Sequence, residues 1–323
     1  MTTEQNDIIL HWYPQSPFAQ KIVAILNYKK LDYKLVQISM MEPRPLRRPL
    51  DANYPKTPIL QIGNQVFCDT KAIIAELESR YPEPSLYPPL KHSGQSSKTL
   101  AFGMTNLLDT SIFAAVPTQF NLDVIPLALL EDRAKMKGNG KFDKAKTKAL
   151  QPYLKLELQA QLDRLTAGLV RGQWILDTET PSDSDFSLFM ITFFLNMVIS
   201  DAWTKEHYPL LVEHFERMVV LTLPDRADTM PQISAEDALQ IAKVQQAPHS
   251  VSTTLSPSAQ GIARIGQKVS VTPLDLGKTP AVGELAALTS DRVVLRINDD
   301  RTGDVYVHFP LTAYVVVPIT SHL

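Results

Sequence analysis

The sequence predicts three successive regions: an α/β domain, an all-helical domain and a small all-β, barrel-like region. Strand and helix patterns alternate over residues 1–87, helical periodicity dominates residues 98–246, and short β-rich runs fill residues 247–323. The segment between the first two regions is rich in proline and serine, which is typical of a linker between domains. A chain of 323 residues is also long enough for two or three domains.

The first region is expected to run strand, helix, strand, long loop, hairpin, helix. A serine before a proline is a helix-start signal, and a Gly-Asn pair between two apolar runs is a hairpin signal. These signals predict a strand at 8–13, a helix from Pro17, a strand at 33–38, a turn at 63–64 and a helix at 70–81.

The second region carries helix patterns. Four leucines repeat at helical spacing over residues 154–169, and two Ser-x-x-Asp sequences, at 182–185 and 234–237, predict capped helix starts. The third region shows about five short runs with alternating apolar residues, such as 293–297 and 305–309, around a turn at 299–304. Such runs favour a small antiparallel barrel or rolled sheet.

Composition narrows the classes of function. The formal net charge is −2, so no basic excess favours nucleic acid or an anionic membrane surface. The longest apolar stretch, residues 186–199, is shorter than a membrane span and predicts a buried helix. Cys68 is the only cysteine and the seven histidines show no metal-ligand spacing, so we expect no metal site and a reducing, cytoplasmic compartment. The polar N-terminus shows no signal-peptide pattern.

Several motifs resemble the glutathione transferases. They are QSPFAQKI, KTPILQI and CDTKAIIAELESRYP in the first region, SLYP in the linker and GQWILDTETPSDSDFSL in the helical region. The resemblance covers roughly residues 1–225 and implies a thioredoxin-like domain packed on a helical bundle, usually as a homodimer. It also implies glutathione as co-substrate, bound mainly on the first domain, and a small apolar electrophile in a cleft against the second. Ordinary transferases lack the β-rich third region.

Ser16 has two compatible roles. It is a good N-cap for the helix from Pro17, worth about 1 kcal/mol. By resemblance it stands at the catalytic Ser or Cys of the family, where a hydroxyl and a helix N-terminus stabilise the glutathione thiolate. The stretch SPFAQ is most similar to the class with Cys-Pro-Phe; with Ser in place of Cys, conjugation, elimination or isomerisation is favoured over thiol–disulfide exchange. Tyr13 is a rival thiol-activating group, although Trp12 occupies the matching position by spacing.

The resemblance implies glutathione contacts from five further residues. A cis Thr57-Pro58 peptide exposes main-chain groups to the cysteinyl part, and Asp69-Thr70, where the family usually has Glu-Ser, meets the γ-glutamyl part at a helix N-terminus. Lys56 is a candidate for the glycyl carboxylate. Each has a structural alternative: a strand-start proline, helix caps and a solvated lysine.

Two functions from different classes follow. One is a glutathione transferase that uses Ser16, with Phe113 and Phe120 as apolar wall for the second substrate. The other is a non-catalytic, transferase-like scaffold whose β-rich tail recruits a partner. The residues do not reveal the second substrate, and glutathione binding separates the two readings.

Overall fold

The first domain follows the predicted order of elements. The computed structural model describes residues 7–138, 141–246 and 253–319. The polar N-terminus 1–6 and the parts 247–252 and 320–323 of the predicted β-rich region lie outside the described residues. The elements are β1 (Ile8–Trp12), α1 (Pro17–Tyr28), β2 (Lys34–Gln37), α2 (Arg48–Asp51), β3 (Ile59–Ile62), β4 (Gln65–Cys68) and α3 (Thr70–Arg80). β1 pairs in parallel with β2 and antiparallel with β3, and β3 and β4 form the predicted hairpin. The short α2 interrupts what was predicted to be a long loop.

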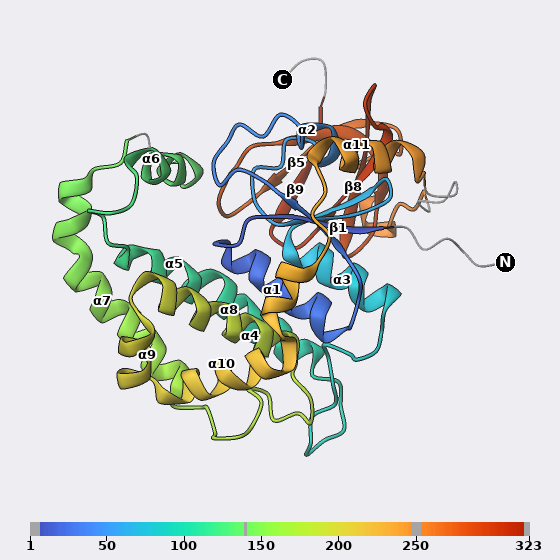
Figure 1. Ribbon diagram of the computed structural model, residues 1–323. Coiled ribbons are helices and arrows are strands. Elements are labelled where there is room, and N and C mark those ends of the chain that lie inside the picture. Colours follow the sequence, from blue (N-terminus) through green and yellow to red (C-terminus); the bar gives the residue numbers. More distant parts are fainter. Residues whose placement is uncertain (1–6, 139–140, 247–252, 320–323) are drawn as a thin grey trace.

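The second domain is helical, as predicted (Figure 1). Its elements are α4 (Lys98–Asn106), the π-helical turn η1 (Leu107–Ile112), α5 (Phe113–Ala115), η2 (Val116–Gln119), α6 (Leu127–Met136), α7 (Lys144–Thr166), α8 (Asp183–Val198), α9 (Asp201–His207), α10 (Pro209–Thr222), η3 (Pro224–Thr229) and α11 (Ala235–Val244). Both predicted Ser-x-x-Asp capping boxes are confirmed, at the starts of α8 and α11. Most residues of α8 are buried, because this helix packs against α1, α4 and α10.

One continuous helical run among the described residues, Lys98–Gln119, is long and apolar enough to cross a bilayer by length and composition alone. Within its most apolar window, 33% of the residues are buried. The helices α8 and α9 meet the same criterion only if they count as one span despite a bend of 119°. Core helices of soluble proteins also meet this criterion of length and composition, so the helical run is only weak evidence for a membrane span.

The C-terminal region is not a barrel-like domain, which corrects the sequence prediction. It contains η4 (Pro257–Ala259) and the strands β5 (Lys268–Pro273), β6 (Ala281–Leu288), β7 (Arg292–Asp299), β8 (Gly303–Pro310) and β9 (Tyr314–Pro318). All nine described strands form one open sheet in the order β2-β1-β3-β4-β8-β7-β6-β5-β9. A barrel closes by pairing its two edge strands, whereas β8 pairs in parallel with β4 of the first domain and β9 pairs only with β5.

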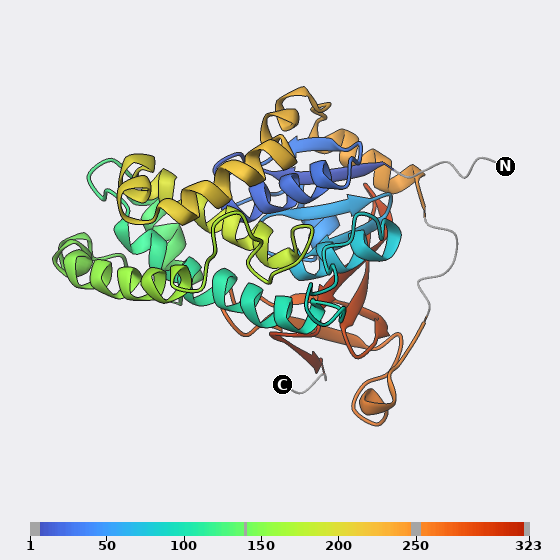
Figure 2. The same cartoon turned by 90° about the horizontal axis from the view of Figure 1, so that it is seen from below.

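The C-terminal region therefore shares a core with the first domain. One cluster of buried side chains joins Ile59 and Val66 of the first domain to Leu295 and Phe309 of the C-terminal strands. Figures 1 and 2 show the helices α4 to α10 on one side of the first domain and the C-terminal strands on another, while α11 lies against the sheet. The first domain is thus the middle layer of the molecule, and both neighbours reach the end of its sheet where the predicted site residues lie.

Candidate functional site

Three chain segments meet at one end of the first-domain sheet. The pairing register places Ile59 at the start of β3 opposite both His11 of β1 and Cys68 of β4. Consequently the chain leaving β1, the Thr57-Pro58 pair that precedes β3 and the Asp69-Thr70 pair that follows β4 all lie at the same sheet edge. The predicted glutathione-contacting residues are brought together by this register.

Ser16 occupies the start of α1. Its backbone is extended (φ −79°, ψ 114°), Pro17 takes the first helical position, and Ser16 Oγ accepts a hydrogen bond of 3.3 Å from the Ala19 amide. The residue is only 3% exposed. No acceptor takes its hydroxyl proton within the described ranges, so the hydroxyl caps the helix and still has a proton to donate.

Tyr13 turns toward the helical domain. Its hydroxyl accepts a hydrogen bond of 3.2 Å from Arg133 Nη2 of α6, whereas Trp12 lies buried in the core beside α1. Successive strand residues point to opposite faces, which explains the different surroundings of these two neighbours. Tyr13 thus ties α6 to the end of β1.

The Thr57-Pro58 peptide bond is cis, as the family resemblance implied. Thr57 Oγ1 accepts a hydrogen bond of 3.1 Å from Arg47 Nη1, and the Arg47 Nε donates to Asp51 Oδ2 at 2.6 Å. Arg47 is 2% exposed and Asp51 is fully buried. This buried ion pair therefore holds Arg47 in place against Thr57, the first residue of the cis peptide.

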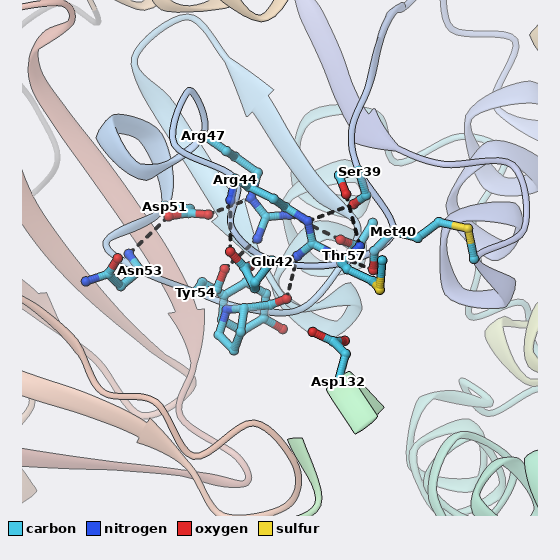
Figure 3. A network of polar contacts seen from close by, with 12 residues as sticks. Ser39, Met40, Glu42, Arg44, Arg47, Asp51, Asn53, Tyr54, Thr57 and Asp132 are labelled. Atoms are coloured by element: carbon cyan, nitrogen blue, oxygen red, sulfur yellow. Dashed lines mark hydrogen bonds and ion pairs between the residues drawn. The ribbon is translucent and has the colours of Figure 1, made fainter. Parts of the chain in front are cut away.

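An arginine network surrounds this approach and was missed by the sequence analysis. Figure 3 shows Arg44 and Arg47 at its centre, with Glu42, Tyr54 and Thr57 around them. Arg44 Nη1 donates to the Pro55 carbonyl at 2.7 Å, and burial lowers the pKa of Arg44 to about 10. The only sequence feature that could have indicated this network is the presence of three arginines within residues 44–48. Buried arginines require carbonyl or carboxylate partners, and the structure supplies them.

Asp69 and Thr70 form the start of α3, where the C-terminal region touches the candidate site. Asp69 has a positive φ of 81°, and its Oδ1 accepts from the Lys71 amide at 3.0 Å as an N-cap. Its Oδ2 accepts a hydrogen bond of 2.9 Å from the hydroxyl of Tyr314, at the start of β9. Thr70 is 8% exposed. The predicted capping role is present, and one carboxylate oxygen also holds the C-terminal region.

Lys56 is paired with the C-terminal region as well. Its Nζ lies 2.6 Å from Asp275 Oδ1 in the loop between β5 and β6, and 5.9 Å from the ring centre of Tyr314. In the same loop Gly277 has φ +65° and donates its amide to the Met136 carbonyl at the end of α6 at 2.7 Å. A Cβ on Gly277 would lie 3.1 Å from Pro55 Cγ, so the close approach of this loop depends on glycine. The loop between β5 and β6 therefore contacts both the first domain and the end of α6.

The helix α1 is anchored to the helical domain by a buried charge. Lys21 Nζ lies 3.2 Å from Asp109 Oδ2 of η1 and 3.0 Å from Asp183 Oδ1 of α8, and it donates to Ser187 Oγ at 2.8 Å. Burial opposes the charged ammonium, but the two carboxylates outweigh it and the pKa of Lys21 is raised. The start of α1 therefore has a fixed position against the second domain.

Phe113 and Phe120 lie in an aromatic cluster at this domain boundary. The ring of Phe113 is 4.5 Å from that of Phe18 on α1 and 5.2 Å from that of Phe194 on α8, and Phe120 also packs on Phe194. Phe18 lies two residues beyond Ser16, so the cluster begins close to the candidate site.

Two further expectations concern reactive and metal-binding groups. Cys68 is completely buried, and burial raises the pKa of its thiol well above the ordinary value, as suits a small core residue. No group of three or more His, Cys, Asp or Glu side chains that could hold a metal ion occurs in the part of the chain that the structure describes.

Comparison with known proteins finds a family model for the first domain and solved structures with a similar architecture. Residues 10–85 match the family model described as "Glutathione S-transferase, N-terminal domain". A solved GST-like protein from Pseudomonas syringae is 25% identical with a TM-score of 0.69, and the alignment covers 97% of this chain and all of that one. Residues 10–85 therefore match a glutathione S-transferase N-terminal domain, and the chain as a whole is similar to a GST-like protein. The Pseudomonas structure matches nearly the whole chain, so the C-terminal region is part of an architecture also found in that GST-like protein.

Other glutathione S-transferases match parts of the chain. Glutathione S-transferase DHAR2 of Arabidopsis thaliana is 30% identical over 91 residues, which are 28% of this chain and 42% of that relative. The chain thus matches less than half the length of this curated relative. Rice GST1, solved in complex with glutathione, is 16% identical with a TM-score of 0.53, covering 73% of this chain and 94% of that one, and shows a shared fold.

Proposed function

We propose that this protein is a glutathione transferase in which Ser16 stabilises the thiolate of bound glutathione. One observation carries the proposal. The buried Ser16 hydroxyl lies at the N-terminus of α1 with its proton uncommitted among the described residues, at the sheet edge shared with the cis Thr57-Pro58 peptide and with Asp69-Thr70. Glutathione is then the co-substrate.

The proposed chemistry follows from the acidity of a thiol. A free thiol is mostly protonated at neutral pH, and only the thiolate is a strong nucleophile. A hydroxyl donor and the positive end of a helix both favour the anion, so they lower the pKa of the bound thiol. The sulfur then attacks a small apolar electrophile in conjugation, or adds reversibly in an isomerisation. The aromatic cluster around Phe113 and Phe120 provides apolar surface for that second substrate.

The test is a titration of the full chain with glutathione by calorimetry, followed by the pH dependence of the thiolate absorbance of bound glutathione. A hydrogen bond to a charged group is worth about 1.5–3 kcal/mol, so Ser16→Ala should raise the pKa of the bound thiol by about one to two units. Ser16→Thr keeps a hydroxyl and should restore most of the effect.

A second capping serine supplies the matched control. Ser234 Oγ accepts from the Asp237 amide at 3.0 Å at the start of α11, in the same capping geometry as Ser16. Ser234→Ala should lower the free energy of unfolding by about 1 kcal/mol, as is expected for Ser16→Ala too, and leave the pKa of the bound thiol unchanged. If glutathione binds and Ser16→Ala leaves that pKa unchanged, Ser16 is a helix cap and the proposed role is wrong.

The alternative function is a non-catalytic scaffold whose β-rich tail recruits a partner. One observation favours it: Lys56 and Asp69, two of the predicted glutathione contacts, are already engaged by Asp275 and Tyr314 of the C-terminal region. The same calorimetric titration separates the two functions. Failure to bind glutathione at millimolar concentration removes the transferase function and leaves the scaffold.

The assembly and compartment are also proposals. We propose a homodimer, because the superfamily resemblance implies one and α4 and η1 expose Leu100, Phe102 and Leu107. We propose a cytoplasmic location, because the only cysteine is buried in the core, which suits a reducing compartment. Sedimentation of the purified chain tests the first proposal, and a fluorescent fusion tests the second.

A further inference from the structure

A cavity of about 220 Å³ lies where all three regions meet. Its walls come from α3, from the linker and α4, and from β7, β8 and the chain after them; they include Phe67, Lys71, Tyr87, Lys98, Phe102 and Arg292. Ligand pockets for drug-sized molecules hold about 300 Å³ or more, so this cavity suits a smaller molecule. Thr70, the first residue of α3, is among the lining residues, so the cavity is a neighbour of the candidate glutathione site.

Two of the cations that line the cavity, Lys71 and Lys98, form no ion pair among the described residues. Four cations and two carboxylates line it. Lys21 is shared by Asp183 and Asp109, and Arg292 Nη1 lies 3.4 Å from Glu76 Oε2. The other carboxylate of the lining, Asp291, accepts a hydrogen bond from the Thr289 hydroxyl. Lys71 and Lys98 have no carboxylate partner in the described part of the chain, and the Lys98 ammonium lies 5.6 Å from the ring centre of Tyr87. Two unpaired ammonium groups, one of them beside the Tyr87 ring, favour an aromatic anion.

The cavity lining also includes a buried hydrogen-bond acceptor that no described residue satisfies. His308 of β8 is 6% exposed and stacks on Phe67 with ring centres 4.4 Å apart. Its Nε2 lies 2.7 Å from Gln65 Oε1, and burial lowers its pKa to about 3, so the ring is neutral and donates through Nε2. The Nδ1 atom is then an acceptor, and it has no hydrogen-bond partner among the described residues. Buried polar atoms rarely stay unsatisfied, which points to a donor that enters from outside the chain.

We propose that this cavity binds a small aromatic carboxylate carrying a hydroxyl or amino group. The carboxylate lies between Lys71 and Lys98, the ring packs against Tyr87 and Phe102, and the hydroxyl or amino group donates to His308 Nδ1. The site exists because β8 pairs with β4, which carries His308 into the space beside α3. The proposal does not depend on glutathione chemistry.

The experiment is calorimetric titration of the full chain with 4-hydroxybenzoate and with benzoate, which lacks the donor. The hydroxylated ligand should bind about tenfold more tightly, because it alone satisfies the histidine acceptor. Lys71→Met and Lys98→Met should each weaken its binding about fivefold or more. Neither substitution touches the cap of α3, because the group capped by Asp69 is the Lys71 backbone amide.

Two controls accompany these titrations: a substitution of a distant lysine and a competition experiment with glutathione. Lys205→Met on α9 removes an exposed lysine elsewhere and should leave the affinity unchanged. The proposal is overturned by no binding at millimolar ligand, by equal affinities for the two ligands, or by wild-type affinity in both Lys71→Met and Lys98→Met. It is also overturned if glutathione displaces the ligand while those two variants bind it normally, because the ligand then occupies the transferase site. Failure of glutathione to bind, with 4-hydroxybenzoate bound as described, contradicts only the transferase proposal.

Discussion

The two helices that begin at the candidate site are held in place by different parts of the chain. α1 begins at Ser16 with a cap made by its own first turn, and Lys21 one turn further on fixes it to the helical domain through a buried ion pair. α3 begins at Asp69, whose second carboxylate oxygen accepts a hydrogen bond from Tyr314, 245 residues later in the chain. The helical domain therefore fixes the start of α1, and the C-terminal region fixes the start of α3.

This difference shows that the first domain does not complete its own site. Its sheet brings the three predicted segments to one edge, but the side chains that fix the two helix starts come from its two neighbours. A change in the helical domain should therefore act first at the sulfur end of a bound glutathione, and a change in the C-terminal region at the end where Lys56 and Asp69 lie.

Lys21→Met tests the anchor of α1 and has the largest expected effect. It leaves Asp109 and Asp183 buried without their cation, which should cost about 3–5 kcal/mol in the free energy of unfolding measured in urea. Lys30→Met removes an exposed lysine just beyond the same helix and should change stability by less than about 0.5 kcal/mol. A loss below about 1 kcal/mol for Lys21→Met would show that the helical domain does not anchor α1.

Tyr314→Phe tests the anchor of α3. The hydroxyl donates to an ionised carboxylate, so its removal should cost about 1.5–3 kcal/mol in unfolding free energy. Asp69→Asn replaces one carboxylate oxygen by an NH2 group, so the side chain no longer offers one oxygen to the Lys71 amide and another to the Tyr314 hydroxyl. Combined with Tyr314→Phe, the two losses should therefore be less than additive in a double-mutant cycle. Tyr306→Phe, in β8 without a side-chain hydrogen bond among the described residues, is the control. Strict additivity would contradict the coupling of α3 to the C-terminal region.

Asp275→Asn has the smallest expected effect on stability. The Asp275 side chain is 52% exposed, so loss of its pair with Lys56 should cost less than about 1 kcal/mol. The freed ammonium should then bind the glycyl carboxylate of glutathione roughly two- to fivefold more tightly, measured by calorimetry at low salt. Asp32→Asn breaks a comparable exposed pair with Arg226 and should leave glutathione affinity unchanged. Unchanged affinity in Asp275→Asn would remove Lys56 from the glutathione site.

Local signals in the sequence predicted the elements well. The caps at Ser16, Ser182 and Ser234, the Gly63-Asn64 turn and the five C-terminal strands each depend on a few neighbouring residues, and each is found in the structure. Whether the implied glutathione contacts are made stays a prediction.

The contacts between distant segments were not predictable from local patterns. Alternation of apolar residues tells which face of a strand is buried but not which strand it pairs with, so β8 read as part of a barrel. Lys56 had a solvated lysine as its structural alternative and Lys21 carried no signal at all, because a sequence does not show the carboxylates that folding brings to them. Arg47 likewise becomes informative only once Thr57 and Asp51 lie beside it.

The parallel pairing of β4 with β8 has a consequence for synthesis of the chain. Val66 of β4 pairs with Val307 of β8, so a ribosome must add about 240 more residues (307 − 66 = 241) before the partner strand exists. At about 5–20 residues per second this takes roughly 10–50 s, during which the nascent chain presents a bare row of peptide groups along β4. Newly made copies on one messenger are therefore exposed to strand pairing with each other until translation is nearly complete.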